Sequence, residues 1–338
     1  MRCLMGVVCI LLSVGEFVLA GDLLVYEGTS GPGKGRHVVC LTGDEEYRSE
    51  EALVQLARIL AFRHGFRATV LFAIDPDDGT INPNVNDSLP HADELGTADA
   101  IVMGLRFRDY PDEVMQHFVD AYLAGKPIVA VRTSTHAFKY ASQSESRFKD
   151  YSHNSQGWPG GFGRQVLGET WVAHLGKNHK EATLGIAADD ASNHPVMSGV
   201  GDIFATSGAY AVDPMDDSVV LMRAQVLAGM TPDSPLESTG KNNPLQPVAW
   251  VREHKNAAGK VNRVLCTTMG AATDLADEDL RRLLVNGVYW GLEMDVPQSA
   301  DVRIVGEYEP TDYGFSGFRK GVKPSDLAMT AEAFFAEE

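Results

Sequence analysis

The sequence has few cysteines and no long hydrophobic run. It contains four cysteines in 338 residues, and two of them, Cys3 and Cys9, lie within the first twenty. Cys40 and Cys266 each sit in a β-like run, and their number and spacing fit neither a disulfide framework nor a zinc site. We therefore predict two small buried core residues. No stretch approaches the ~18 consecutive apolar residues of a transmembrane helix, so no membrane span is predicted.

Basic residues are outnumbered. The chain has 29 Lys and Arg against 46 Asp and Glu, a formal net charge of −17. This balance argues against a nucleic-acid partner and against an anionic membrane surface, because both require basic patches. A neutral or cationic small molecule fits better, and a homo-oligomer stays open. The sequence also lacks a P-loop and lacks G-x-G-x-x-G after its first strand, so no nucleotide cofactor is expected.

The first twenty residues have the pattern of a secretory signal peptide. Arg2 precedes an apolar run from Leu4 to Leu12, and Val18-Leu19-Ala20 provides a cleavage site before Gly21. The run is too short to span a membrane. The prediction is a signal peptide over residues 1–20, cleaved after Ala20, and a periplasmic or secreted protein. The alternative is a buried N-terminal strand.

Strand and helix patterns alternate along the rest of the chain. Short apolar runs predict strands, and apolar residues at helical spacing predict helices between them. The strands are expected at 37–41, 68–74, 100–103, 127–131, 182–187 and 219–223, with a hairpin of 248–252 and 263–268. The helices are expected from Ser49 to Gly65, over 111–125 and over 278–292. Ser49 can cap the first of them. This order predicts an α/β domain over 37–295 with a mostly parallel sheet covered on both faces. Residues 296–338 have no such period and predict an extended tail.

Polar residues follow three of the predicted strands. In open parallel sheets, ligands bind outside the carboxyl ends of the strands where the strand order reverses, so a shared pocket is expected there. Carboxylates and a histidine would act as acid or base, and arginines would hold a carboxylate or hydroxyls. The candidates are Glu45, Glu46, Asp109 and His136 for catalysis, and Tyr47, Arg48, Arg106, Arg108, Arg132 and Thr133 for substrate binding. The alternative is that each run is a solvated turn whose arginines pair with its acids.

Further candidates come from the less regular middle of the chain. Trp158, beside Gly160 and Gly161, offers a flat surface for a sugar ring, although a buried core tryptophan is equally consistent. His174 and His179 would contact substrate from a Gly- and Lys-rich loop. They could also approach a metal, but the sequence lacks the H-E-x-x-H helix and a clear third ligand, so no metal site is assigned.

A serine nucleophile on a strand-to-helix turn is disfavoured. The turn Arg132-Thr133-Ser134-Thr135-His136 follows a strand, yet Arg132 and His136 occupy the positions of both glycines of G-x-S-x-G. A serine-hydrolase elbow is therefore not expected.

Several separate motifs resemble the ThuA-like, or trehalose-utilisation, family, and are closest to its secreted planctomycete-type members. The motifs are Thr42–Glu51 (TGDEEYRSEE), Arg106–Asp109 (RFRD), Arg132–Phe138 (RTSTHAF), Gly160–Gly168 (GGFGRQVLG), Asn193–Val196 (NHPV), Thr267–Gly270 (TTMG) and the tail segment 314–324. The resemblance implies a flavodoxin-like, doubly wound α/β fold related to class I glutamine amidotransferases. It also implies a link to carbohydrate metabolism, including oxidised (keto) sugars.

The chain departs from these relatives at two places. Amidotransferases carry a cysteine nucleophile after the corresponding strand, whereas this turn has Thr133 to His136, so glutamine hydrolysis is not expected. The wider family often has a histidine directly after the glycine of the late strand, and here Ala271 follows Gly270.

Three functions follow as hypotheses. The first is an enzyme outside the cytoplasm that acts on a sugar or keto-sugar derivative by hydrolysis, elimination or isomerisation. The second is a carbohydrate-binding protein without catalysis. The third is a metal-dependent hydrolase that uses His136, His174 and His179.

Overall fold

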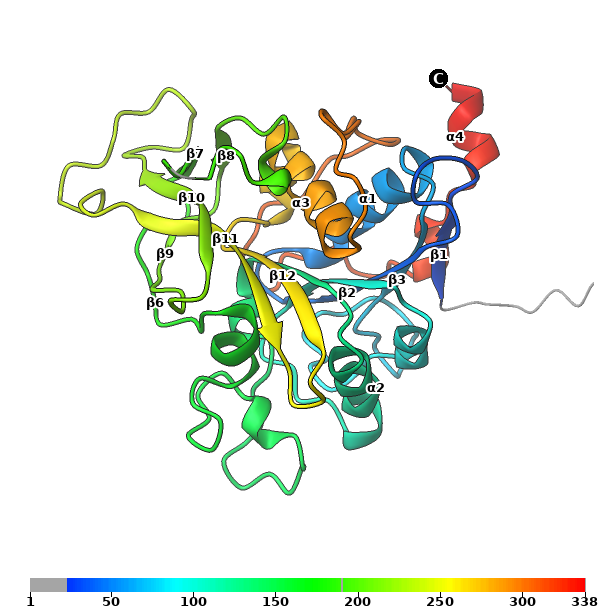
Figure 1. Cartoon of the computed structure of the whole chain (residues 1–338). Coiled ribbons are helices and arrows are strands. Elements are labelled where there is room, and N and C mark those ends of the chain that lie inside the picture. The colour runs from blue at the N-terminus through cyan, green and yellow to red at the C-terminus, as the bar shows by residue number, and fades with distance from the viewer. Residues whose placement is uncertain (1–22, 190, 338) are drawn as a thin grey trace, which may run out of the picture.

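A large mixed β-sheet forms the centre of the molecule (Figure 1). The computed structural model describes residues 23–189 and 191–337, so the predicted signal peptide lies outside the described residues. Within them, the sheet has ten strands in the order β1-β3-β2-β4-β5-β12-β11-β10-β7-β8. Their bounds are β1 Leu24–Glu27, β2 His37–Gly43, β3 Arg67–Leu71, β4 Ala100–Leu105, β5 Ile128–Val131, β7 Thr183–Ala187, β8 Ile203–Ala205, β10 Val219–Val226, β11 Gln246–Lys255 and β12 Val261–Thr267. A separate pair joins β6 (Ala173–His174) to β9 (Tyr210–Ala211).

Five neighbouring strands of the sheet are parallel. β3, β2, β4, β5 and β12 pair in parallel registers, while β1, β11, β10, β7 and β8 pair in antiparallel registers. Numbered along the chain, the parallel strands have the order 2-1-3-4-5, which is the flavodoxin-like order. The expected fold class is thereby confirmed. The order reverses between β2 and β4, so a crevice is expected at their carboxyl ends.

Helices cover both faces of the sheet, as predicted. The helices are α1 Ser49–Phe62, α2 Asp112–Leu123, α3 Glu278–Gly291 and α4 Ala331–Glu337, with short turns at η1 Ala92–Gly96, η2 Arg132–His136, η3 Lys149–Tyr151, η4 Gly163–Leu167, η5 Pro195–Met197, η6 Ala272–Ala276 and η7 Pro324–Leu327. α1 and α3 lie on one face and α2 on the other (Figure 1). Because successive strand residues point to opposite faces, Val38 and Cys40 of β2 enter the core under α1 and α3, and Val39 and Leu41 enter the core under α2.

The start of α1 differs from the sequence expectation. Ser49 does not cap this helix: the N-cap is Arg48, which has a left-handed φ of 61°, and the Ser49 hydroxyl accepts a hydrogen bond of 3.0 Å from the Gly43 N–H instead. The serine therefore ties the end of β2 to the helix. The left-handed turn at Arg48 shapes the connection that carries the acidic run.

The predicted tail lies along α1 and continues toward β1 (Figure 1). Tyr26 of β1 donates a 2.7 Å hydrogen bond to the Leu327 carbonyl, and Phe334 of α4 stacks on Phe62 at 5.6 Å between ring centroids. Val302 and Val305 are buried in the same core as α1 and α3. The tail is thus packed onto the domain at Val302, Val305, Leu327 and Phe334.

Two further expectations concern buried side chains and membranes. Cys40 and Cys266 are free thiols in the core, as predicted.

None of the described helices has both the length and the apolar character to cross a bilayer.

Candidate functional site

The three polar runs predicted from the sequence meet at one edge of the sheet. The connections after β2, β4 and β5 carry Asp44 to Arg48, Arg106 to Asp109, and Arg132 to His136. These strands are neighbours in the sheet, so their carboxyl ends bring distant residues into contact, such as Asp44 and Thr133, which lie 89 positions apart. This edge is the reversal point of the strand order.

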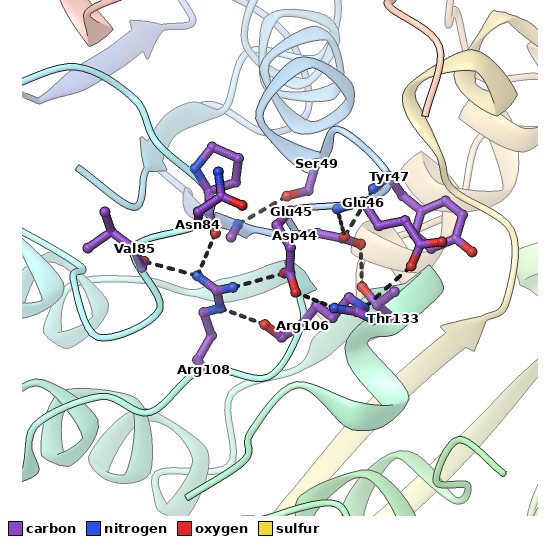
Figure 2. Close-up of polar contacts among 12 residues, drawn as sticks. Asp44, Glu45, Glu46, Tyr47, Ser49, Asn84, Val85, Arg106, Arg108 and Thr133 are labelled. Carbon is purple, nitrogen blue, oxygen red and sulfur yellow. Dashed lines mark hydrogen bonds and ion pairs between the residues drawn. The ribbon is translucent and has the colours of Figure 1, made fainter. Parts of the chain in front are cut away.

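Glu45 lies between two arginines of the next connection (Figure 2). Its Oε1 accepts a hydrogen bond from Arg106, and its Oε2 accepts one of 3.1 Å from Nη2 of Arg108. Arg108 is 1% exposed, and its other N–H groups donate to the carbonyls of Arg106, Pro83 and Val85 at 2.7, 3.1 and 3.1 Å. Arg108 and Glu45 therefore lie at the edge where a crevice is expected, and four of the five N–H groups of Arg108 are already engaged in these hydrogen bonds.

Asp44 organises the turn that carries the acids. Its Oδ1 accepts hydrogen bonds from the N–H groups of Glu46 and Tyr47 at 2.8 and 3.0 Å, and its Oδ2 accepts one of 2.5 Å from the Thr133 hydroxyl. The turn after β2 is thereby tied to the connection after β5 (Figure 2). Thr133, predicted to contact substrate, serves this tie and is fully buried.

Glu46 is held more loosely than Glu45. Its Oε2 lies 3.6 Å from Nε of Arg106, which is an ion-pair distance beyond hydrogen-bond range, and its side chain is 14% exposed. Burial raises the pKa of this carboxyl above its ordinary value, and the nearby charge of Asp44 adds to the effect, while Arg106 and Arg132 oppose it. A carboxyl with a raised pKa in a crevice is suited to accept and return a proton.

Arg132 occupies the first position after the central strand β5 and has a left-handed φ of 47°. Its guanidinium carbon lies 4.2 Å from the ring centroid of Tyr47 and 4.1 Å from that of Tyr210, so the cation is stacked against two aromatic rings. Its Nη1 donates to the carbonyls of Gly208 and Thr268 at 2.8 and 2.6 Å. Its buried Nε and Nη2 find no acceptor among the described residues.

His136 lies in a cluster of aromatic rings beside these charges. It is 3% exposed, and its ring centroid lies 5.0 Å from that of Phe107, 5.4 Å from that of Trp171 and 6.2 Å from that of Tyr210. Burial holds the pKa of His136 well below its ordinary value, and the positive charges of Arg106 and Arg132 act in the same direction. The imidazole is therefore neutral near pH 7.

Two predicted site residues lie apart from this group. Asp109 lines a neighbouring hollow of about 460 Å³ together with Asp87 and Tyr110, where burial and the charge of Asp87 raise its pKa. Trp158 packs with Tyr151 at 5.1 Å on the hydrophobic cluster that covers the α2 face. Trp158 is partly buried there and lies apart from the acidic and basic groups.

The remaining predicted residues contact the side chains and loops around this group. His174 makes ring contacts with Tyr210 at 5.0 Å and Trp171 at 6.0 Å, and His179 stacks on Tyr313 at 4.3 Å. Arg48 donates to the carbonyls of Glu45 and Gly314. A search of residues 23–189 and 191–337 finds no group of three or more His, Cys, Asp or Glu side chains arranged to hold a metal ion, so His136, His174 and His179 do not form the set that the third hypothesis requires.

Sequence reasoning missed residues that complete the crevice. Asp44 was within the acidic run, and its position directly after β2 could have marked it. Tyr210 and Tyr313 come from irregular segments far along the chain and carry no local signal. A further missed residue is Asp274, which is fully buried and whose Oδ2 accepts hydrogen bonds from the N–H groups of Gly270 and Ala271 at 3.0 Å. Asp274 thereby fixes the connection after β12.

Comparison with known proteins yields matches only among solved structures: no family model and no curated protein matches the chain. A ThuA-like protein from Parabacteroides merdae is 15% identical over 88% of this chain and all of its own, with a TM-score of 0.47. A ThuA-like protein from Bacteroides uniformis is 15% identical over 79% of this chain and 94% of its own, with a TM-score of 0.48. PurLQS from Thermotoga maritima is 10% identical over 75% of this chain and 98% of its own, with a TM-score of 0.39.

The first two structures bear the family name that the sequence motifs resemble. Their identities and TM-scores are too low to carry an argument about activity. The fold assignment rests on the strand order and the parallel registers described above.

Proposed function

We propose that the protein is an enzyme that acts on a small carbonyl-bearing sugar by proton transfer, with Glu46 as the general base and acid. The observation that supports this most directly is the contrast between two adjacent carboxylates. Glu45 is fixed by two arginines, whereas Glu46 has only a 3.6 Å ion pair with Arg106 and has a raised pKa. Neighbouring carboxyl groups with different environments are the usual basis of acid/base assignments.

The chemistry follows from the charges around Glu46. Its carboxylate takes a proton from the carbon next to the substrate carbonyl, the C–H electron pair forms a carbon–carbon double bond, and the carbonyl oxygen becomes an enolate oxygen. Arg106 and Arg132 supply positive charge close to Glu46, and such preorganised charge stabilises a developing oxyanion. Return of the proton to the former carbonyl carbon, with transfer of the hydroxyl proton of the adjacent carbon to the enolate oxygen, gives isomerisation. Departure of a β-hydroxyl as water, which carries the proton that Glu46 took, gives elimination.

The aromatic surroundings support a sugar as substrate. Phe107, Trp171 and Tyr210 lie within ring-contact distance of His136, next to the charged groups. Aromatic faces combined with carboxylates and arginines suit a molecule that has both apolar C–H faces and hydroxyls.

The test is exchange of substrate hydrogen with solvent. The purified protein is incubated in D₂O with fructose, glucose and their keto-oxidised derivatives, and loss of the proton next to the carbonyl is followed by NMR. Glu46→Gln, which keeps the shape of the side chain, should lower the exchange rate about 10²-fold or more. Asp87→Asn, in the neighbouring hollow, is the matched control and should exchange like the wild type.

Two outcomes reject the proposal. Equal exchange in the wild type and Glu46→Gln removes the role of Glu46. Binding of sugars by calorimetry without any exchange or turnover favours the carbohydrate-binding hypothesis instead.

We also propose that the protein acts outside the cytoplasm, on the signal-peptide pattern of residues 1–20. Mass spectrometry of the protein expressed with its full sequence should give an N-terminus at Gly21. An N-terminus at Met1 in the mature protein contradicts this.

A further inference from the structure

The tail segment from Thr311 to Gly317 is anchored directly beside Glu46. The Gly314 N–H donates a 2.6 Å hydrogen bond to the Glu46 carbonyl, and Arg48 donates to the Gly314 carbonyl. Thr311 donates from its N–H and its hydroxyl to the Glu51 carboxylate at 2.7 and 2.6 Å. The backbone of this segment therefore has a fixed position relative to the crevice.

Tyr313 reinforces this anchor from the opposite side. It is 5% exposed, and its ring lies 4.3 Å from that of His179 and 5.3 Å from that of Tyr47. Its hydroxyl donates to the Thr206 carbonyl at 2.9 Å and accepts from the His179 N–H at 3.2 Å. The tail thus connects the turn after β2 with the loop that carries His179.

Phe315 is the exception in this well-packed segment, because its side chain is 62% exposed. Its ring lies 5.1 Å from the guanidinium carbon of Arg106, the residue that pairs with both Glu45 and Glu46. An exposed phenylalanine two residues from a buried anchor is held at the crevice and still offers an open aromatic face.

Building on the proposed function, we propose that Phe315 is a substrate-binding residue that stacks against the apolar face of a pyranose ring. The C-terminal tail would then contribute one wall of the substrate site. An aromatic ring beside carboxylates and an arginine matches a sugar ring, whose C–H face is apolar and whose edge carries hydroxyls. An acyclic polyol presents the same hydroxyls without a flat face, so the inference predicts selectivity for rings.

The experiment is calorimetric titration of methyl β-D-glucopyranoside, D-glucose and sorbitol into the full chain. Phe315→Ala should weaken binding of the two ring sugars about 3- to 10-fold, since an aromatic contact contributes about 0.5–1.5 kcal/mol. Its sorbitol affinity should equal that of the wild type, and Phe315→Trp should restore ring binding. Leu236→Ala is the control, because Leu236 is a similarly exposed apolar residue in the connection between β10 and β11.

The outcomes separate this inference from the proposed function. Ring-sugar affinity that is unchanged in Phe315→Ala, or reduced equally for sorbitol, overturns the role of Phe315, while the Glu46 test stands independently. A wild-type protein that binds none of the three ligands, and shows no exchange with any sugar, rejects both.

Discussion

The Glu45 carboxylate and the Arg108 guanidinium are joined by a 3.1 Å hydrogen bond between Oε2 and Nη2, although the residues are 63 positions apart. Arg108 is almost fully buried, and each of its nitrogen atoms donates to an acceptor. The pair lies at the edge of the sheet where the strand order reverses. Its integrity should therefore decide both the stability of this edge and the position of the neighbouring Glu46.

We predict that Arg108→Ala lowers the free energy of unfolding by about 3–5 kcal/mol, because it leaves one oxygen of a partly buried carboxylate and the carbonyls of Pro83 and Val85 without this partner. Arg108→Lys should restore little, since an ammonium cannot reproduce the forked geometry. Urea unfolding measures both effects. Arg36→Ala is the control: Arg36 is exposed and pairs with Asp99 at 3.2 Å, so its removal should cost less than about 1 kcal/mol. Similar losses in the two alanine variants would contradict the prediction.

Arg106 should control the pKa of Glu46. Burial raises this pKa, and Arg106 provides the largest opposing effect because its positive charge favours the carboxylate. Arg106→Gln should therefore raise the pKa of Glu46 further and move the acidic limb of the activity profile to higher pH. Carbon-13 NMR of the Glu46 carboxyl measures the titration directly and needs no substrate. Arg147 is an exposed arginine that pairs with Asp112, so Arg147→Gln should leave the pKa of Glu46 unchanged. A downward shift in Arg106→Gln would refute the assignment.

Glu50 should make stability fall as the pH rises. Burial raises its pKa from about 4.5 to about 8, and both carboxyl oxygens lack hydrogen-bond partners among the described residues. The folded state thus holds this proton more tightly than the unfolded state, so the contribution is complete below pH 4.5 and is lost as the pH rises toward about 8. The shift in the pKa of Glu50 sets an upper limit of about 5 kcal/mol on the loss of unfolding free energy.

The variant Glu50→Gln tests this prediction. It should be more stable than the wild type at pH 8.5, and the difference should shrink toward pH 4.5, as measured by urea unfolding at several pH values. The matched control is Glu113→Gln, in the first turn of α2, where the side chain is exposed. An advantage of Glu50→Gln that is constant with pH would show that the carboxyl is not the titrating group.

Tyr313 should determine whether the tail segment around Gly314 stays bound beside Glu46. Tyr313→Ala removes the stacking on Tyr47 and His179, so the Gly314 amide, protected by its bond to the Glu46 carbonyl, should exchange its hydrogen faster. Exchange in β4 and β5 should be unchanged. Tyr313→Phe keeps the ring contacts and loses only the hydroxyl, so it should give an intermediate rate. Equal protection of Gly314 in Tyr313→Ala and in the wild type would show that the tail is held by other contacts.

Much of the fold follows from local patterns in the sequence. β2, β4 and β5 are fully buried apolar runs, and the inner residues of α3, such as Leu280, Leu284 and Val288, repeat at helical spacing. Short strands such as β8 and β9 have two or three residues and no measurable period, so they escape such analysis. Ser49 was misassigned because a serine before a helix can bind the neighbouring strand as well as cap the helix.

The candidate site was predictable in position and less so in detail. Parallel topology alone brings the connections after β2, β4 and β5 together, so Glu46 and Arg106 could be assigned to one crevice. Whether an arginine faces substrate or backbone depends on tertiary contacts, and Arg108 turned out to hold carbonyls. Phe315 could not be found at all, because its place beside Arg106 depends on how the tail folds back over α1.

The tail also sets an order of events during synthesis. When a ribosome has synthesised about 300 residues, every strand of the sheet and the helices α1, α2 and α3 have been made. Tyr313, Gly314 and Phe315 have not yet been added. The framework can therefore assemble before its crevice is finished. A chain that ends between Val305 and Tyr313 would keep the buried valines of the core and lose the tail residues beside Glu46, so such a product should retain a ligand poorly.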